Sequence, residues 1–281
     1  MKTFEEIMKK EIIIRGLSQR TQEIYLRQMR KFIQHIKKSP DEVTLEDINN
    51  YQYYLKDKGI KWNSYNQSVC AIRFFYLNTI KRDWSINHIP YSRRKKKLPI
   101  VLSKQDIIDL YKTITYPKHK AMFLTLYSTG VRVSEIVNLK ISDIDSKRMM
   151  IRIDQGKGNK DRYVVLSPKL LVSLRKYWKS MKVKPTKWLF PGANIEKKMC
   201  RKSVHTFVKK IQKKSGIKKS IHPHIFRHSF ATHLLEAGVD IKRIQILMGH
   251  RNIQTTSVYF HVAEDYTSKV KTPLDIININ Y

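Results

Sequence analysis

The segment TGVRVSEIVNL, which begins at Thr129, places an arginine three positions before a glutamate. Gly130 is expected to end one helix, and Ser134 or Thr129 can begin the next. Arg132 then lies in the first turn of a helix, where free backbone N–H groups favour an anion. Glu135 can hold the guanidinium group in place. By themselves, an arginine and a glutamate at this spacing are more often a surface ion pair.

Lys157 lies in a second segment that could do chemistry. Residues 149–166 have alternating apolar residues on both sides of the sequence GKGNK, which predicts two short strands joined by a glycine-rich turn. The flanking glycines allow the backbone to come close to a ligand. Ordinary exposed turns show the same pattern, so a role for Lys157 needs support from the other segments.

A third segment, residues 222–238, has the sequence HPHIFRHSFATHLLEAG and predicts a helix that begins after Pro223. His224 and Arg227 are three residues apart and share a face adjacent to the buried stripe. A lone histidine near a core is usually structural, but a histidine and an arginine together at a helix start suit a phosphate. The predicted buried stripe consists of Phe226, Phe230 and Leu234.

The fourth segment contains His250 and Tyr259. Gly249 is expected to end a helix, which leaves His250 in the turn that follows. Tyr259 comes nine residues later, on a predicted short helix. A phenol hydroxyl can act as a nucleophile, but the chain has 15 tyrosines, and a single tyrosine is normally a packing residue.

The four segments keep the order TGxRxSE, GKGxK, HxxRH and GH, followed by a tyrosine nine residues later. In this pattern the chain resembles, over roughly residues 100–265, the catalytic domain of the tyrosine recombinases, the phage-integrase and Xer family. The resemblance implies a site-specific DNA recombinase that cleaves and religates strands through a 3′-phosphotyrosyl intermediate, for integration, excision or dimer resolution. It implies that Tyr259 is the nucleophile. Glu135, by its spacing from Arg132, is expected to be a supporting residue. The catalytic residues so implied are Arg132, Lys157, His224, Arg227, His250 and Tyr259.

Elementary chemistry agrees with these roles. A free tyrosine has a pKa near 10, so at pH 7 only about one in 10³ is ionised, a cost of about 4 kcal/mol. His224 could accept the phenol proton, and Arg132 and Arg227 could donate N–H groups to the phosphate oxygens as negative charge builds. His250 could add a further donor. Lys157 could protonate the departing 5′ oxygen, because an ammonium group has a transferable proton and a guanidinium group in practice does not.

No cofactor and no metal ion are expected. The reaction exchanges one phosphoester for another and therefore needs neither ATP nor a hydrolytic metal, and the sequence has no Walker motif. Cys70 and Cys200 are far apart and lack the spacing of zinc ligands. Neither a zinc finger nor a disulfide framework is therefore predicted.

Three other functions stay open on the residues alone. A non-catalytic DNA-binding protein on the same scaffold would bind DNA without covalent capture. A type IB topoisomerase would relax DNA without exchanging strands between two sites. A metal nuclease would lose its activity in EDTA, and its ligands could come from a set of histidines. That set is His222, His224, His228, His233, His250 and His261.

The charge of the chain indicates a polyanionic partner. The chain has 56 Lys and Arg against 23 Asp and Glu, a formal net charge of +33 and a sequence pI near 10.1. Residues 1–90 hold 16 basic and 10 acidic residues, and residues 91–281 hold 40 and 13. The positive electrostatic field of such a chain attracts nucleic acid. A ribosomal-type or chaperone-like basic protein and an anionic membrane surface are the alternatives, and a genome bias towards lysine could also account for part of the charge.

Residues 1–90 are predicted to form a small bundle of helices joined by short turns. Ser18 can cap a helix that ends before Pro40. Thr44 with Asp47 can begin a second helix, and a third is expected from about Ser64 to Ile80. In the C-terminal part, Ser103 and Asp106 have the spacing of a capping box.

Residues 91–99 are predicted to be a basic linker. The segment between Pro90 and Pro99 has no helical or strand period and contains five consecutive basic residues. A linker of this charge is well suited to cross a phosphate backbone, although a solvated charge run is the plain alternative. The predicted DNA-binding residues are Arg93, Arg94, Lys95, Lys96 and Lys97, together with Lys160 of the glycine-rich turn.

The predicted fold class is mainly α with a small antiparallel β-sheet, in a two-domain DNA clamp. Residues 1–90 would be a helical core-binding domain of the SAM-like kind, residues 100–265 the catalytic domain, and residues 266–281 a tail that could dock on a neighbouring protomer. By the resemblance, the partners are double-stranded DNA recombination sites, held two at a time by a homotetramer. An accessory DNA-bending protein or a partner recombinase could take part.

The N-terminus does not predict a signal peptide or a membrane span. Its apolar run, Ile12 to Ile14, is too short for either. The expected location is therefore the cytoplasm, in association with the nucleoid, with no membrane partner.

Overall fold

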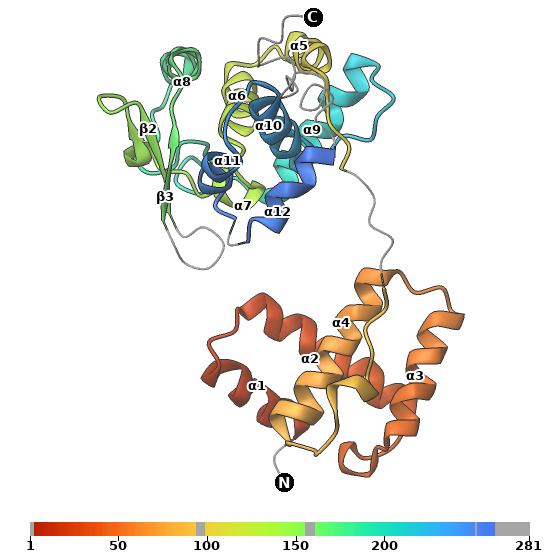
Figure 1. Ribbon diagram of the computed structural model, residues 1–281. Coiled ribbons are helices and arrows are strands. Elements are labelled where there is room, and N and C mark those ends of the chain that lie inside the picture. Colours follow the sequence, from red (N-terminus) through yellow and green to blue (C-terminus); the bar gives the residue numbers. More distant parts are fainter. Residues whose placement is uncertain (1–2, 94–98, 155–160, 251, 262–281) are drawn as a thin grey trace, which may run out of the picture. The chain divides into compact units, whose positions relative to one another are not determined.

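The computed structural model describes residues 3–93, 99–154, 161–250 and 252–261. The chain divides into two compact units, Met1–Lys96 and Lys97–Tyr281 (Figure 1). The fold is mainly helical with one small antiparallel sheet, which confirms the predicted class. Within the described ranges, no helix combines the length and the apolar character that crossing a membrane would need.

Hydroxyl side chains cap the first helices of the N-terminal unit. Thr3, Ser18 and Thr44 each accept a hydrogen bond from a backbone N–H group of the first turn, a donor that a helix start leaves free. The predicted caps at Ser18 and Thr44 are confirmed, whereas the helix that follows Thr3 was not predicted. The elements are α1 (Phe4–Ile14), α2 (Gln19–Ile36), η1 (Pro40–Glu42), α3 (Leu45–Asp57), α4 (Trp62–Arg73), η2 (Phe74–Thr79) and η3 (Ile86–His88).

The core of this unit lies where α2 packs against α3 and α4. Phe32, Ile48 and Ile72 are fully buried there. The ring of Phe32 meets that of Tyr51 edge-on, with 5.0 Å between centroids. Apolar burial of this kind is the main source of stability for helices that have little stability in isolation.

The third predicted helix differs from the observed one. It begins at Trp62 instead of Ser64, and beyond Arg73 it widens into the π-helical segment η2. The amide of Ile80 donates to the carbonyl of Phe75, five residues back, at 3.0 Å. The sequence period did not reveal this change, because helix-like spacing of apolar residues continues through the wider turn.

The first residues of the predicted linker lie against α3 and α4. The side-chain amide of Gln52 donates to the carbonyl of Pro90 at 3.0 Å, and the indole N–H of Trp62 donates to the carbonyl of Ser92 at 2.6 Å. The segment that leaves the N-terminal unit is therefore held to its helices up to Ser92. Residues 94–98 lie outside the described part of the chain.

The C-terminal unit combines helices with a three-stranded antiparallel sheet of order β1-β2-β3. The predicted capping box of Ser103 and Asp106 is confirmed. The elements are α5 (Lys104–Lys112), α6 (Pro117–Thr129), α7 (Val133–Ile136), η4 (Ile141–Asp143), β1 (Ile144–Asp145), β2 (Met150–Ile153), β3 (Arg162–Val165), α8 (Pro168–Ser180), α9 (Arg201–Ser215), α10 (Pro223–Glu236), α11 (Ile241–Met248), α12 (Gln254–Ser257) and η5 (Val258–His261).

Strands β2 and β3 form the predicted hairpin. Ile151 lies opposite Val164 in the register, and both are buried, while the neighbouring residue Tyr163 is exposed. This alternation is the pattern from which the strands were predicted. The short strand β1 adds a third partner that was not predicted. Residues 155–160, which include Lys157 and Lys160, lie outside the described residues.

Helix α10 lies at the centre of this unit and contacts α6, α9, α11 and η5 (Figure 1). Phe226 of the predicted stripe is fully buried, and Phe230 and Leu234 are partly buried against an apolar cluster. Neighbours on several sides also bury residues around most of the rest of the helix. Arg227, predicted to lie beside the stripe, is only 4% exposed. Phe226 packs edge-on against Phe123 of α6, with 5.1 Å between ring centroids.

Gly130 allows the turn after α6 to lie directly against α10. Its φ of +60° is in the left-handed region, and a Cβ at this position would lie 2.5 Å from the ring of Phe230. The carbonyl of Gly130 also accepts a hydrogen bond from the Arg227 guanidinium group. A side chain at this position would therefore disturb both the helix contact and an arginine of the site described below.

We expect Gly130→Ala to lower the free energy of unfolding by about 2–4 kcal/mol, the sum of left-handed strain and overpacking. Gly216→Ala is the matched control, because Gly216 also ends a helix at positive φ, +72°, but has no atom within 4 Å of an added Cβ. In Gly216→Ala the free energy of unfolding should fall by only about 1–2 kcal/mol, the left-handed strain alone. Chemical denaturation of both variants measures the difference, and equal losses would contradict the packing argument.

Candidate active site

Arg132 begins helix α7 and is its N-cap residue. Its backbone N–H donates to Glu135 Oε2 and its Nη1 donates to Glu135 Oε1, both at 2.7 Å. The predicted pairing with Glu135 is thus confirmed, although the residue that caps the helix is Arg132 and not Thr129 or Ser134. The side chain of Arg132 remains 18% exposed, so part of its guanidinium group is accessible to an anion.

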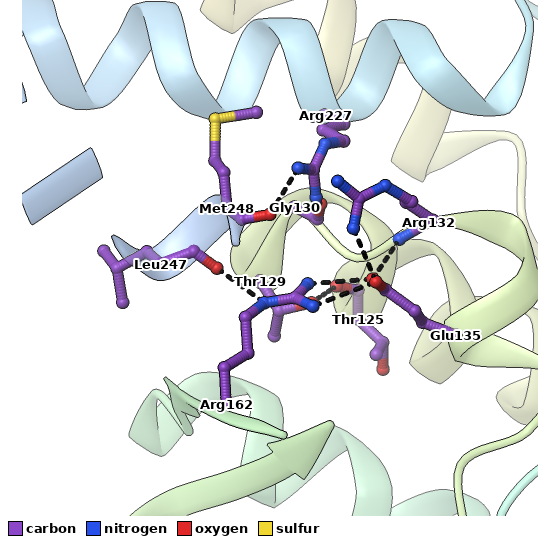
Figure 2. Close-up of polar contacts among 9 residues, drawn as sticks. All are labelled: Thr125, Thr129, Gly130, Arg132, Glu135, Arg162, Arg227, Leu247 and Met248. Atoms are coloured by element: carbon purple, nitrogen blue, oxygen red, sulfur yellow. Dashed lines mark hydrogen bonds and ion pairs between the residues drawn. The ribbon is translucent and has the colours of Figure 1, made fainter. Parts of the chain in front are cut away.

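Glu135 is a buried carboxylate between two guanidinium groups (Figure 2). Besides Arg132 it accepts two parallel hydrogen bonds from Arg162, Nη1 to Oε1 at 2.9 Å and Nη2 to Oε2 at 2.8 Å. Burial by itself raises the pKa of Glu135, but the hydrogen bonds and charge of Arg162 and Arg132 outweigh it and lower the pKa to about 2. The carboxylate is therefore ionised at any pH at which the protein would work.

Arg162 was not predicted as part of the site. It is the first residue of β3, its side chain is 9% exposed, and its Nε also donates to the carbonyl of Leu247 at 3.0 Å. In the sequence it is one basic residue among many in this lysine-rich chain. The only available signal was its place at the start of a strand directly after the glycine-rich turn.

Arg227 is held by two backbone carbonyls (Figure 2). Nη1 donates to Gly130 at 2.5 Å and Nη2 donates to Met248. Burial and the positive charge of Arg132 lower the pKa of Arg227 to about 9, so the guanidinium group is still cationic at pH 7. Backbone partners fix its plane without neutralising its charge, which leaves a buried cation that an anion would stabilise.

His250 follows α11 in the turn, as predicted, because Gly249 ends that helix in the left-handed conformation. Its Nδ1 lies 2.8 Å from the hydroxyl oxygen of the buried Thr256. Burial, together with the charges of Arg227, Arg132 and other cations, lowers the pKa of His250 to about 4. In the tautomer that accepts from Thr256, the proton is on Nε2, and that nitrogen can donate to a ligand.

His224 lies in the first turn of α10 and is exposed. Desolvation and the neighbouring charges of His222, Arg227 and Arg132 lower its pKa. A neutral imidazole at pH 7 can accept a proton. The protonation state of His224 is therefore compatible with the predicted role of a base.

Tyr259 lies in η5 and is only 4% exposed. It belongs to a small apolar cluster with Ala231, Leu235, Ile244 and Met248. Burial raises the pKa of Tyr259, although the charges of Arg227 and Arg132 act in the opposite direction. In this conformation the phenol is protonated at neutral pH and is a weak nucleophile.

The hydroxyl of Tyr259 lies 3.1 Å from Nδ1 of His228, not beside His224. Burial and the nearby cationic and histidine groups lower the pKa of His228 to about 4, so its ring is neutral at pH 7. With the ring proton on Nε2, Nδ1 can accept the hydrogen bond of the phenol. His228 was considered in the sequence only as one of several histidines, and its contact with Tyr259 was not predicted.

The structure brings most of the predicted catalytic residues together in the C-terminal unit. The pKa values of His250, His224 and Tyr259 all respond to the charges of Arg132 and Arg227. Arg93 is exposed in the N-terminal unit. The remaining predicted site residues lie outside the described part of the chain: Lys157, Lys160 and Arg94 to Lys97.

The histidines do not form a metal site within the described residues, where no three His, Cys, Asp or Glu side chains are grouped as ligands. His233 has a structural contact instead, with its Nδ1 2.8 Å from the Tyr127 hydroxyl. The described residues of the site are a set of fixed cations and N–H donors close to one tyrosine. It can bind a phosphate group and stabilise negative charge that develops on its oxygens.

The chain is similar in sequence and in fold to known integrases and recombinases. Residues 101–265 match the model of the phage integrase family, and residues 4–86 match the phage integrase N-terminal SAM-like domain. A putative integrase/recombinase of Sinorhizobium fredii is 40% identical over 99% of this chain and 90% of its own length. The tyrosine recombinase XerD of Oceanobacillus iheyensis is 33% identical over 90% of this chain and 91% of its own length. The Tn1549 transposon integrase in complex with transposon right end DNA has the same fold, with a TM-score of 0.74, 22% identity, and coverage of 95% of this chain and 98% of that chain.

We expect the stabilising effect of Glu135 to depend on pH. Because its pKa is depressed in the folded state, its contribution is fully present above the unfolded pKa near 4.5 and is lost as the pH falls towards about 2. The stability difference between the wild type and Glu135→Gln should therefore narrow by about 2 kcal/mol from pH 6 to pH 3. Chemical denaturation at each pH measures this difference. Glu196→Gln, which changes an exposed carboxylate of the same unit, should show no such narrowing.

Proposed function

Because this chain belongs to the phage integrase family of tyrosine recombinases, we propose that Tyr259 is its nucleophile and that Arg132, Arg227 and His250 form its phosphate pocket. The chain is a site-specific recombinase that transfers DNA strands by the tyrosine mechanism. The observation that supports the residue assignments best is the fixed pair of guanidinium groups. Arg132 is held by Glu135 and Arg227 by two carbonyls, in the same unit as Tyr259.

The proposed reaction is a transesterification. The phenol oxygen of Tyr259 forms a bond to the scissile phosphorus as the bond to the 5′ oxygen breaks. The phenol proton passes to His224, and Lys157 donates a proton to the departing 5′ oxygen. The products are a 3′-phosphotyrosyl link and a free 5′ hydroxyl. Attack by a different 5′ hydroxyl on this link reverses the step and completes strand exchange.

The nucleophile has to leave its present position for this reaction. Tyr259 is buried, and its hydroxyl is paired with His228. We propose that DNA binding moves η5 so that the phenol reaches the phosphate beside Arg132 and Arg227. The charges of these arginines already favour the ionised phenol. Removal from the apolar cluster would add to that effect, because burial is what raises the pKa of Tyr259.

The proposed partners are double-stranded DNA recombination sites, and the net charge of +33 supports them. The helical region 1–90 would be the core-binding domain, residues 91–99 the basic linker, and residues 100–265 the catalytic domain. Residues 93–97 and Lys160 would contact phosphates. The assembly would be a homotetramer on two sites, acting in integration, excision or dimer resolution in the nucleoid.

Tyr259→Phe should leave DNA affinity within about twofold of the wild type and remove the covalent adduct on a nicked suicide substrate, because it deletes only the attacking oxygen. Gel-shift titration and denaturing electrophoresis of the product measure the two properties. Tyr163→Phe is the matched control, since Tyr163 is an exposed tyrosine on β3, and it should keep the adduct. An adduct that persists in Tyr259→Phe would assign the nucleophile to another residue.

Residues 273–281 are proposed to dock on a neighbouring protomer. Their removal should leave binding and cleavage of a single site intact and reduce pairing of two sites by at least about tenfold, because the loss of one contact of about 1.4 kcal/mol already has this effect. Native electrophoresis of complexes with one and two sites measures both steps. Unaltered pairing and exchange in the truncated protein would contradict the docking proposal.

A further inference from the structure

His250 is held both by its backbone and by one neighbouring side chain. Its amide N–H donates to the carbonyl of Gln245 at 3.1 Å, and the side-chain amide of Gln245 donates to the carbonyl of His250 at 3.0 Å. These contacts come from α11, which packs against α12 (Figure 1). From α12, the hydroxyl oxygen of Thr256 lies 2.8 Å from Nδ1 of His250. The backbone of His250 is therefore fixed by α11 and the orientation of its ring by Thr256.

The hydroxyl proton of Thr256 has one acceptor in the described part of the chain. Thr125 and Thr129, two other buried threonines of this unit, donate to the carbonyl four residues earlier in their own helix, at 2.8 and 2.6 Å. Among the described residues, the Thr256 hydroxyl makes no such bond, and Nδ1 of His250 is its only hydrogen-bond partner. Thr256 is 1% exposed, and a buried donor without an acceptor is costly. The hydroxyl therefore donates to Nδ1.

The direction of this hydrogen bond determines which nitrogen of His250 carries the ring proton. Burial, together with the charges of Arg227, Arg132 and other cations, lowers the pKa of His250 to about 4. At pH 7 the ring is therefore neutral and has a single N–H group. Because Nδ1 accepts from Thr256, that proton is on Nε2. The other tautomer would present the lone pair of Nε2 to a ligand, and a lone pair repels a phosphate oxygen.

We propose that Thr256 is a positioning residue, which holds the ring of His250 and keeps its single proton on Nε2, where it can form a hydrogen bond to the scissile phosphate. The inference rests on the proposed place of His250 in the phosphate pocket. A donor contributes to the reaction only when its N–H group is directed at the oxygen on which negative charge develops. Removal of the Thr256 hydroxyl should therefore weaken the contribution of His250 without abolishing it.

The tautomer of His250 can be measured without DNA. In long-range proton–nitrogen NMR spectra of the full chain with isotopically labelled histidine, a ring nitrogen that bears a proton resonates far from one that does not. The signals of His250 are those that disappear in His250→Ala. At pH 7 we expect the wild type to have the proton of His250 on Nε2. Thr256→Val, which replaces the hydroxyl by a methyl group of similar size, should be a mixture of both tautomers.

The effect on the reaction is measured as the rate at which the covalent adduct forms on a nicked suicide substrate. His250→Ala should lose about 10²–10³-fold, the usual effect of removing one donor to a developing negative charge. Thr256→Val should lose about tenfold, because one hydrogen bond is worth about that factor. Thr256→Ser keeps the hydroxyl and should recover most of this loss. In the His250→Ala background, Thr256→Val should add less than about twofold, because the threonine acts through the histidine.

Thr255→Val is the matched control. Thr255 directly precedes Thr256 in α12, so the same substitution changes the intrinsic helix propensity equally, but Thr255 is exposed. This variant should stay within about twofold of the wild-type rate and leave the tautomer of His250 unchanged. Gel-shift titration and thermal unfolding of every variant separate the effect on the reaction from lost binding or lost folding.

A ring proton on Nδ1 in the wild type would overturn the proposal. So would a tenfold loss in Thr256→Val that persists in the His250→Ala background, since the threonine would then act through Tyr259 or another group. If Thr256→Val does not fold, the wild-type tautomer and the rates of Thr256→Ala decide the question in the same way. An unaltered rate in His250→Ala would instead refute the proposed place of His250 in the pocket, and the inference with it. A loss in His250→Ala without a loss in Thr256→Val would refute only the inference.

Discussion

A buried carboxylate shared by two guanidinium groups is the interaction on which the rest of the site depends. Glu135 accepts hydrogen bonds from Arg132 and Arg162, which come from α7 and β3. An ionised group removed from water costs several kcal/mol unless its partners have good geometry. The low pKa of Glu135 indicates that these partners more than offset that cost. The carboxylate therefore fixes where α7 and β3 meet, and with them the direction of Arg132.

The cations of the site outnumber its anion. Arg132, Arg162 and Arg227 surround one carboxylate, and Arg227 is satisfied by backbone carbonyls that do not neutralise it. An excess of fixed positive charge is unfavourable in a buried place and becomes favourable when a phosphate arrives. Burial and the same positive charge together lower the pKa of His250 to about 4 and keep its ring neutral at pH 7. The arginines are therefore held in place by groups of the protein itself.

Different forces stabilise the arginines of the proposed phosphate pocket and the proposed nucleophile. Ion pairs and backbone hydrogen bonds hold the arginines, whereas burial in an apolar cluster and one contact with His228 hold Tyr259. Burial keeps the phenol protonated, so the group that would attack DNA is unreactive in this conformation. Among the described residues, no hydrogen bond joins the hydroxyl of Tyr259 to the arginines, so the proposed movement of η5 would break none of their hydrogen bonds.

The sequence by itself determined the features that depend on neighbours along the chain. The caps at Ser18, Thr44 and Ser103 were predictable, because each is a hydrogen bond between residues three positions apart. The ends of α6 and α11 were also predictable, because glycine takes up left-handed backbone at little cost. Two further features depend on residues close together in the sequence and were predictable for that reason. They are the pairing of Arg132 with Glu135 and the hairpin of β2 and β3.

Only the tertiary structure decided which distant side chains meet. The pairing of Glu135 with Arg162 joins residues 27 positions apart, and Arg162 reaches Leu247 across 85 positions. The burial of Arg227 and the contact of Tyr259 with His228 follow from the packing of α6, α11 and η5 around α10. No local pattern encodes such contacts, because a long-range ion pair depends on the relative placement of whole elements. Residue types and spacing therefore indicated the candidate chemical groups, and packing determined which of them are buried and which side chains they contact.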